Sequence, residues 1–170
     1  MKKLFLAIMV AMSTVTFAQT QKGNYLIETE TTFNQQDVNT GIGYYSTKNG
    51  DKKLNVGVSG GYFVAKNLAL KAGVGYGTTI YDSNTLSSVW SYRAGVEYYI
   101  NGLVPVQVTW SGASVKNLKY DPSYISTQVG YAWFVNKNLL VKPFVRYDIA
   151  LTNHYNDGFG AGVGFGYIFK

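Results

Sequence analysis

The 170-residue sequence contains no cysteine, one histidine and only three prolines. Without cysteine there are no disulfide bonds and no thiolate metal sites, so backbone hydrogen bonds and packing must hold the fold. Charged residues make up only 14% of the chain, which is less than the surface of a soluble protein usually carries. The polarity of the chain therefore comes from Gly, Ser, Thr, Asn and Gln rather than from ions.

The chain also lacks an apolar run of the length, about 20 residues, that a membrane-spanning helix needs. Its N-terminus instead has the pattern of a secretory signal peptide: Lys2 and Lys3, an apolar run over 4–12, and a small-residue cleavage site ending at Ala18. We predict a signal peptide over 1–18 and one mature domain over 19–170. Removing Lys2 and Lys3 lowers the formal charge from +6 to +4, and export argues against a nucleic-acid partner.

Helical periodicity is missing from the mature chain, whereas alternation with period two recurs throughout, which predicts an all-β protein. The clearest example is the C-terminal segment, where glycines separate apolar residues. The apolar positions there are Phe159, Ala161, Val163, Phe165, Tyr167 and Phe169, and the glycines are Gly160, Gly162, Gly164 and Gly166.

Eight alternating segments can be counted, and an even number suits a closed membrane barrel. Residues 41–47 either extend the second strand or form a ribbon beyond the membrane. Short connections alternate with longer polar ones, as in membrane barrels. The predicted strands are 24–33, 52–63, 68–80, 89–100, 104–111, 124–134, 139–151 and 159–169, with short turns at 64–67, 101–103 and 135–138 and longer loops at 34–51, 81–88, 112–123 and 152–158.

A short internal repeat supports this count. Residues 63–71 match residues 134–142 at six of nine positions. The two copies are four predicted strands apart, which places them on opposite sides of an eight-stranded ring. The alternative is that two short turns between apolar strands look alike without a common origin.

Alternation by itself fits both a soluble lipocalin-type barrel and a membrane barrel. The interior of an eight-stranded ring is just filled by side chains, and it is too small for all the aromatic rings of the apolar face. We therefore predict that this face points outward to lipid, with aromatic girdles at both interfaces. The girdle residues are Tyr62, Tyr98, Trp133, Tyr167 and Phe169 near the short turns, and Trp90, Trp110, Tyr147 and Phe159 near the long loops.

Three features together resemble the small outer-membrane β-barrel domain family, often labelled porin-like. They are the strand start over 22–25, the Gly-Tyr-Phe-Val-Ala-Lys-Asn-Leu-Ala-Leu stretch over 61–70, and the glycine-alternating last strand. The resemblance implies an eight-stranded antiparallel up-and-down transmembrane β-barrel in the outer membrane. It also implies assembly by the barrel assembly machinery through a C-terminal aromatic residue, although Lys170 follows Phe169 here.

The residues that strand alternation points into the lumen include positive and negative side chains in similar numbers. Unpaired buried charges are costly, so a narrow lumen predicts ion pairs and a plugged barrel. We expect Lys71 to pair with Glu97, and Lys142 to lie opposite Lys71. The alternative is a selective pore lined by charged rings. The predicted lumen network comprises Glu28, Glu30, Lys71, Arg93, Glu97, Lys142, Arg146 and Asp148, accompanied by Gln107 and Gln128.

The loops carry a mild basic bias that suits contact with anionic outer-leaflet glycolipid. An enzyme reading would use His154 with Asp157 or Asp148 and an activated Ser123, and no spacing supports it. We predict a structural outer-membrane barrel, with loop-mediated binding or a role in envelope maintenance. We expect a monomer without catalytic residues, cofactor or metal; a narrow passive channel is the alternative, and a lipid-modifying enzyme is less favoured. The basic loop residues are Lys48, Lys52, Lys53, Lys116 and Lys119.

Overall fold

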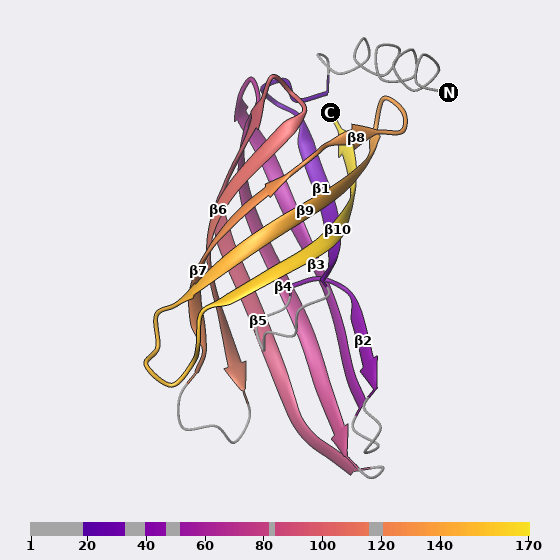
Figure 1. Ribbon diagram of the computed structural model, residues 1–170. Helices are drawn as coiled ribbons and strands as arrows, with labels where there is room; N and C mark the ends of the chain where they lie inside the picture. The colour runs from indigo at the N-terminus through magenta and orange to yellow at the C-terminus, as the bar shows by residue number, and fades with distance from the viewer. Residues whose placement is uncertain (1–18, 33–39, 47–51, 82–83, 116–120) are drawn as a thin grey trace, which may run out of the picture.

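A computed structural model describes residues 19–32, 40–46, 52–81, 84–115 and 121–170, and the predicted signal peptide lies outside them (Figure 1). The described residues contain no helix long and apolar enough to cross a membrane. They form ten strands: β1 (Tyr25–Thr32), β2 (Gly43–Ser46), β3 (Lys52–Ala65), β4 (Leu68–Tyr81), β5 (Asn84–Ile100), β6 (Val104–Val115), β7 (Ser123–Gly130), β8 (Trp133–Phe134), β9 (Leu139–Ala150) and β10 (Gly158–Phe169).

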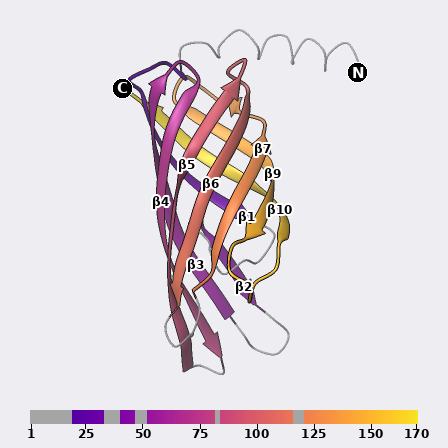
Figure 2. The ribbon, with the colours of Figure 1, turned by 90° about the vertical axis from the view of Figure 1, so that its left-hand side faces the viewer.

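Eight of these strands form a closed barrel. The hydrogen-bonded order is β1-β10-β9-β7-β6-β5-β4-β3, and β3 pairs back onto β1. Every pairing is antiparallel, so the chain runs up and down around the barrel (Figures 1 and 2). The prediction of an eight-stranded antiparallel barrel is therefore confirmed. Closure matters because an open sheet edge would leave unpaired backbone groups in hydrocarbon.

Two of the predicted segments differ clearly from the strands of the structure. A single strand over 124–134 was wrong, because the chain leaves the ladder between β7 and β8. There the amide of Tyr131 donates to Pro143 (3.0 Å), and that of Ala132 donates to Leu103 (2.7 Å). A polar loop over 81–88 was also wrong, since β4 runs to Tyr81 and β5 begins at Asn84.

Strands β3, β4 and β5 extend past the other strands at the long-loop end (Figure 1). Strand β2 adds a fourth strand to this extension by pairing Gly43 to Ser46 with Asn55 to Lys52. Of the two structures considered for residues 41–47, the ribbon is therefore the one found over the described residues 43–46. Strand β6 likewise continues to Val115, into a segment predicted as loop.

The seam between β1 and β3 is short, because only the four residues from Tyr25 to Glu28 pair across it. Past Glu28 the seam is completed by residues 40–42. The amide of Ile42 donates to the carbonyl of Glu30 (2.7 Å), and the side chain of Asn55 donates to the carbonyl of Gly41 (2.7 Å). Thr40 lies so close to β3 that a Cβ at Gly57 would clash with its backbone.

The barrel wall separates two chemically different faces. Large apolar side chains are exposed on its outer face, for example Leu70, Val74 and Tyr76 along β4. The intervening residues Lys71, Gly73 and Gly75 face inward and are buried. The orientation predicted from the alternation, with the large apolar side chains of these strands outward, is the one found.

The glycines of β10 make room for large inward side chains on β9. A Cβ at Gly162 would lie 2.6 Å from the ring of Phe144, and one at Gly164 would lie 3.3 Å from Cε of Lys142. A Cβ at Gly166 would lie 3.1 Å from Leu140. The glycine face of the last strand therefore allows three bulky side chains of its neighbour to occupy the lumen.

Candidate functional site: the barrel lumen

The lumen collects charged side chains from several strands that are far apart in sequence. Glu28 and Glu30 come from β1, Lys71 from β4, and Arg93 and Glu97 from β5. The remaining three, Lys142, Arg146 and Asp148, come from β9. All of them lie on the inward face: those of β1 and β9 are register partners of glycines of β10, and those of β4 and β5 lie two residues from a glycine of their own strand. Four cations thus meet four anions in one interior.

Two lysines and two glutamates form a closed ring across the lumen, which we call the charge ring: Glu28, Lys71, Glu97 and Lys142. Lys71 Nζ lies 2.7 Å from Glu28 Oε1 and 3.3 Å from Glu97 Oε2. Lys142 Nζ lies 2.7 Å from Glu28 Oε2 and 2.6 Å from Glu97 Oε1. Each carboxylate therefore bridges both ammonium groups, and the four side chains are at most 1% exposed. Such a ring offsets the desolvation cost that a single buried charge would carry.

A second polar layer lies next to the charge ring. Arg93 donates to Glu30 Oε2 (2.8 Å) and to the hydroxyl of Ser59 (3.0 Å). Gln128 donates to the other oxygen of Glu30 at 3.4 Å, while Gln107 accepts from Lys71 at 2.8 Å. The charged layers are thus joined to neutral amides and hydroxyls: Gln128 donates to a free lone pair of Glu30, whereas Gln107 and Ser59 accept from N–H groups of Lys71 and Arg93.

The half of the lumen nearer the long loops is less tightly filled. Arg146 Nε donates to Asp148 Oδ2 at 3.1 Å, and the Arg146 side chain is 10% exposed. A cavity of about 10 Å³ lies beside this pair, lined by small hydroxyl residues and by Arg93 and Thr40. That volume is about the space that one water molecule needs.

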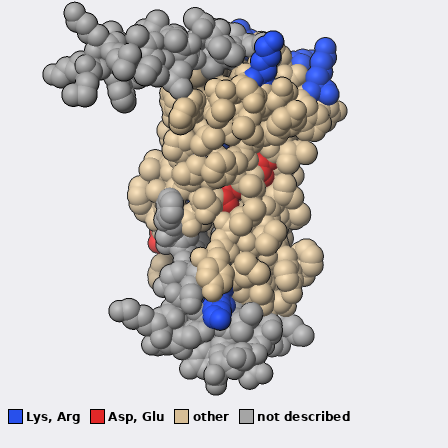
Figure 3. All heavy atoms as spheres, turned by 90° about the vertical axis from the view of Figure 1, so that its right-hand side faces the viewer, with Lys and Arg blue, Asp and Glu red and all other residues tan. Residues whose placement is uncertain are grey.

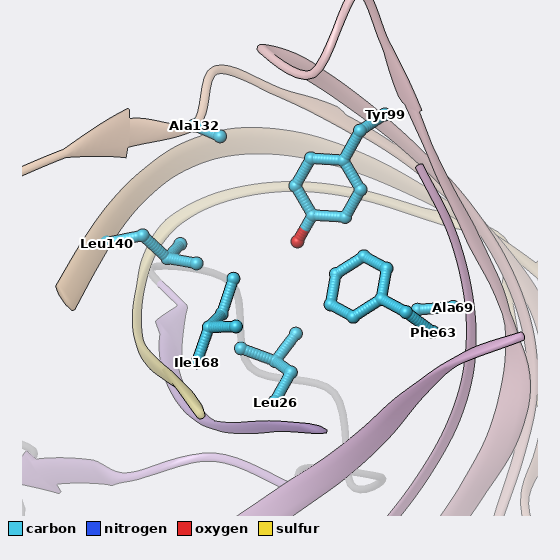
Figure 4. Close-up of a cluster of buried hydrophobic side chains, with 7 residues drawn as sticks. All are labelled: Leu26, Phe63, Ala69, Tyr99, Ala132, Leu140 and Ile168. Carbon is cyan, nitrogen blue, oxygen red and sulfur yellow. The ribbon is translucent and has the colours of Figure 1, made fainter. Parts of the chain in front are cut away.

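An apolar cluster closes the half of the lumen nearer the short turns (Figure 4). Its large members, Phe63, Tyr99 and Leu140, are completely buried, and the rings of Phe63 and Tyr99 lie 5.8 Å apart. The hydroxyl of Tyr99 donates to Glu97 at 3.1 Å and so connects the cluster to the charge ring. The cluster comprises Leu26, Phe63, Ala69, Tyr99, Ala132, Leu140 and Ile168.

Sequence reasoning missed this cluster, because it assigned the interior to glycines and ions alone. The sequence does contain a signal for the cluster. Leu26 lies two residues from Glu28, and Phe63 lies two residues from Gly61, so strand alternation places both side chains on the lumen side of the wall. The internal repeat contains the same information, since Ala69 and Leu140 occupy matching positions and are both buried. Lys71 and Lys142 also match in the repeat and contact the same two carboxylates from opposite sides of the lumen.

Comparison with solved structures shows which known fold this barrel has. The N-terminal β-barrel domain of OprF from Pseudomonas aeruginosa matches with a TM-score of 0.54 and 16% identity, over 87% of this chain and 98% of that one. The outer membrane protein OprG from the same organism matches with a TM-score of 0.53 and 12% identity, over 88% and 97%. Ail of Yersinia pestis matches with a TM-score of 0.51 and 13% identity, over 87% and 100%.

The chain has the fold of a small outer-membrane β-barrel. No family model and no curated protein matches its sequence. At these low identities the likeness extends to the fold, and the residues that fill the lumen must be interpreted from their own contacts.

The outer surface of this outer-membrane-type barrel carries the aromatic residues predicted as girdles. All nine are exposed, from 36% for Phe169 to 64% for Phe159. Two of them, Tyr167 and Phe169, stack with ring centroids 6.2 Å apart, and two others pack against further exposed aromatic rings: Trp90 against Tyr76 at 5.0 Å and Tyr62 against Tyr25 at 5.1 Å. Amphipathic rings at both ends of an apolar wall are typical of membrane interfaces.

The residues considered for an enzyme have structural contacts at the long-loop end. Asp157 accepts from the amide of Ala150 (2.9 Å) and the hydroxyl of Tyr147 (3.3 Å). Ser123 accepts from the indole nitrogen of Trp110 at 3.0 Å, and His154 is exposed. Within the described ranges, no three His, Asp or Glu side chains come close enough to hold a metal ion.

Proposed function

We propose that the protein is an integral outer-membrane barrel with a structural role and a closed lumen. The fold supports the membrane setting, and so does the outer face of exposed apolar side chains flanked by aromatic rings. In membrane barrels the short turns face the periplasm and the long loops face outward, which gives the orientation that we adopt.

The main support for a closed lumen is that two successive layers of side chains fill it. The charge ring spans the interior with four side chains that are at most 1% exposed. The apolar cluster packs directly beneath it toward the short turns. An ion crossing the barrel would have to break the ring and enter a dry apolar layer, where it would lose its hydration without new ligands.

Single-channel recording in planar bilayers tests this proposal. The folded protein is expected to give no stable conductance steps. A triple variant with Phe63, Tyr99 and Leu140 changed to Ala removes the large members of the apolar layer and serves as the positive control, because it should leak. Stable steps from the unaltered protein would contradict the closed lumen.

A narrow passive channel is the second candidate, and one observation favours it. Around Arg146 the lumen holds a small cavity lined by polar side chains, with room for about one water molecule. If ions pass, changing Asp148 to Asn should alter the cation-to-anion permeability ratio. A ratio that stays the same in a conducting protein would exclude this route.

Loop-mediated contact with anionic outer-leaflet glycolipid and insertion by the barrel assembly machinery remain part of the proposal. Lys52 and Lys53 are exposed at the long-loop end, where such glycolipid would lie. Lys48, Lys116 and Lys119 lie outside the described residues. The lipid-modifying alternative makes a separate prediction: His154→Ala should abolish modification of outer-leaflet lipid, and an unchanged lipid profile would exclude it.

A further inference from the structure

The rim of the barrel that carries the short turns is basic. Lys22, Lys66, Lys137 and Lys170 are exposed there. Across the described rim segments 19–24, 65–68, 101–103, 131–138 and residue 170, the sequence has no Asp or Glu. Lys and Arg side chains gather at this end of the face shown in Figure 3. The rim is therefore suited to anionic groups.

Three of these lysines lie over neighbouring strands. Lys22 precedes β1, Lys66 lies in the turn from β3 to β4, and Lys170 follows β10. Strand β1 pairs with both β3 and β10, so the three lysines share one arc of the rim. The β5–β6 turn, made of Asn101, Gly102 and Leu103, has no charge. The positive charge is thus concentrated above the β1–β3 seam.

The outer wall below this arc has a shallow, open groove. The groove, of about 420 Å³, opens sideways from the wall, and its surface is mainly apolar. Its floor includes Gly60 and Ala72, which pair across β3 and β4, and a Cβ at Gly60 would meet nothing within 4 Å. Three aromatic residues of the groove pack together toward the lysines: Tyr25 lies 5.1 Å from Tyr62 and 5.7 Å from Phe169 between ring centroids.

We propose that the groove and the three lysines form a binding site for one anionic glycerophospholipid. The phosphate would lie among Lys22, Lys66 and Lys170, and an acyl chain would fill the groove over Gly60. Charge complementarity favours an anionic head, and the sideways opening of an apolar groove favours a ligand with a chain. A peptide or a soluble polymer would use the lysines without the groove. The inference rests on the proposed membrane setting, in which the short turns face the phospholipid leaflet.

Native mass spectrometry of the full barrel in detergent provides the test, with dioleoyl phosphatidylglycerol and dioleoyl phosphatidylcholine as probes. The unaltered protein should bind phosphatidylglycerol about tenfold more tightly than phosphatidylcholine, since each lysine near an anionic surface contributes measurably to binding. The K22Q/K66Q/K170Q variant should lose this preference. The matched variant K52Q/K53Q, altered at the opposite end, should keep it.

A second variant tests the groove independently of charge. Gly60→Leu places a side chain in open space, so the barrel should fold while binding of both lipids at this site falls. Equal binding of the two lipids to the unaltered protein would overturn the proposal. So would an equal loss in K52Q/K53Q, unchanged binding in Gly60→Leu, or competition by glycerol 3-phosphate as effective as that by the lipid. Gel migration before and after heating is a separate control: a missing shift in the unaltered protein would refute the barrel itself rather than the lipid site.

Discussion

The two halves of the lumen use the same inward-facing positions and are built differently. Toward the short turns, the charge ring and the apolar cluster leave their large side chains almost without exposure. Toward the long loops, Arg146 and Asp148 form a single ion pair beside a cavity of about 10 Å³. The tightly packed part of the lumen therefore lies in the half nearer the short turns.

The two halves of the lumen hold their charged side chains in two different ways. In the short-turn half each charge has two opposite partners, because four strands contribute to one ring. In the long-loop half the pair comes from one strand and keeps partial access to water. Breaking the first arrangement should leave a dry, unpaired charge, whereas breaking the second leaves a charge that water can still reach.

The largest effect should come from removing one cation of the charge ring. Lys142→Met leaves Glu28 and Glu97 to share Lys71, and loss of one partner of a buried ion pair costs about 3–5 kcal/mol. Equilibrium unfolding in urea from phospholipid vesicles, followed by tryptophan fluorescence, measures the change. The control Lys137→Met, at an exposed turn position, should change stability by less than about 0.5 kcal/mol. Similar small losses in both variants would show that the ring does not stabilise this half.

The apolar layer should be nearly as sensitive. Leu140→Ala leaves a cavity inside the barrel, and such changes cost about 2–5 kcal/mol. The adjacent change Leu139→Ala removes the same atoms from the outer face, where lipid can fill the space, so its cost should be clearly smaller. The same urea titration compares the two. Equal losses would mean that the inner cluster is no better packed than the lipid-facing wall.

Substitution of a lumen-facing glycine of β10 should cause an intermediate loss of stability. Gly162→Val places a Cβ within clashing distance of the carbonyl oxygen of Thr31 and 2.6 Å from the ring of Phe144, and overpacking of this kind costs about 1–3 kcal/mol. Gly60→Val, on the outer face with nothing within 4 Å, should cost much less. The temperature at which the gel shift of the folded barrel is lost gives the ranking. A reversed order would contradict the assignment of these glycines to inner and outer faces.

The smallest effect is expected in the long-loop half. Arg146→Met breaks the pair with Asp148, yet the partly exposed pair and its cavity should limit the loss to about 1 kcal/mol. Urea unfolding beside Lys142→Met tests the contrast between the halves directly. A loss as large as that of Lys142→Met would show that both halves are equally dry, and the comparison would fail.

Much of the fold could be predicted because strand alternation is a local property of the backbone. Alternate residues of a strand point to opposite faces of the barrel wall. The outward aromatic residues and the inward charged residues could therefore both be identified from the sequence. The breaks and extensions were missed, since the gap between β7 and β8 depends on hydrogen bonds to Pro143 and Leu103 in other parts of the chain.

The sequence by itself determined which charged residues face the lumen and that their charges balance, because strand alternation and composition need no knowledge of neighbours. Only the tertiary structure decided how high each side chain lies in the barrel and which side chains from distant strands meet in the lumen. Strand stagger and closure bring Lys71 and Lys142 onto the same two carboxylates, and they place Phe63, Tyr99 and Leu140 together below them. Apart from Lys71 with Glu97, which lie on the paired strands β4 and β5, those contacts join strands that are not hydrogen-bonded neighbours, so no local pattern encodes them.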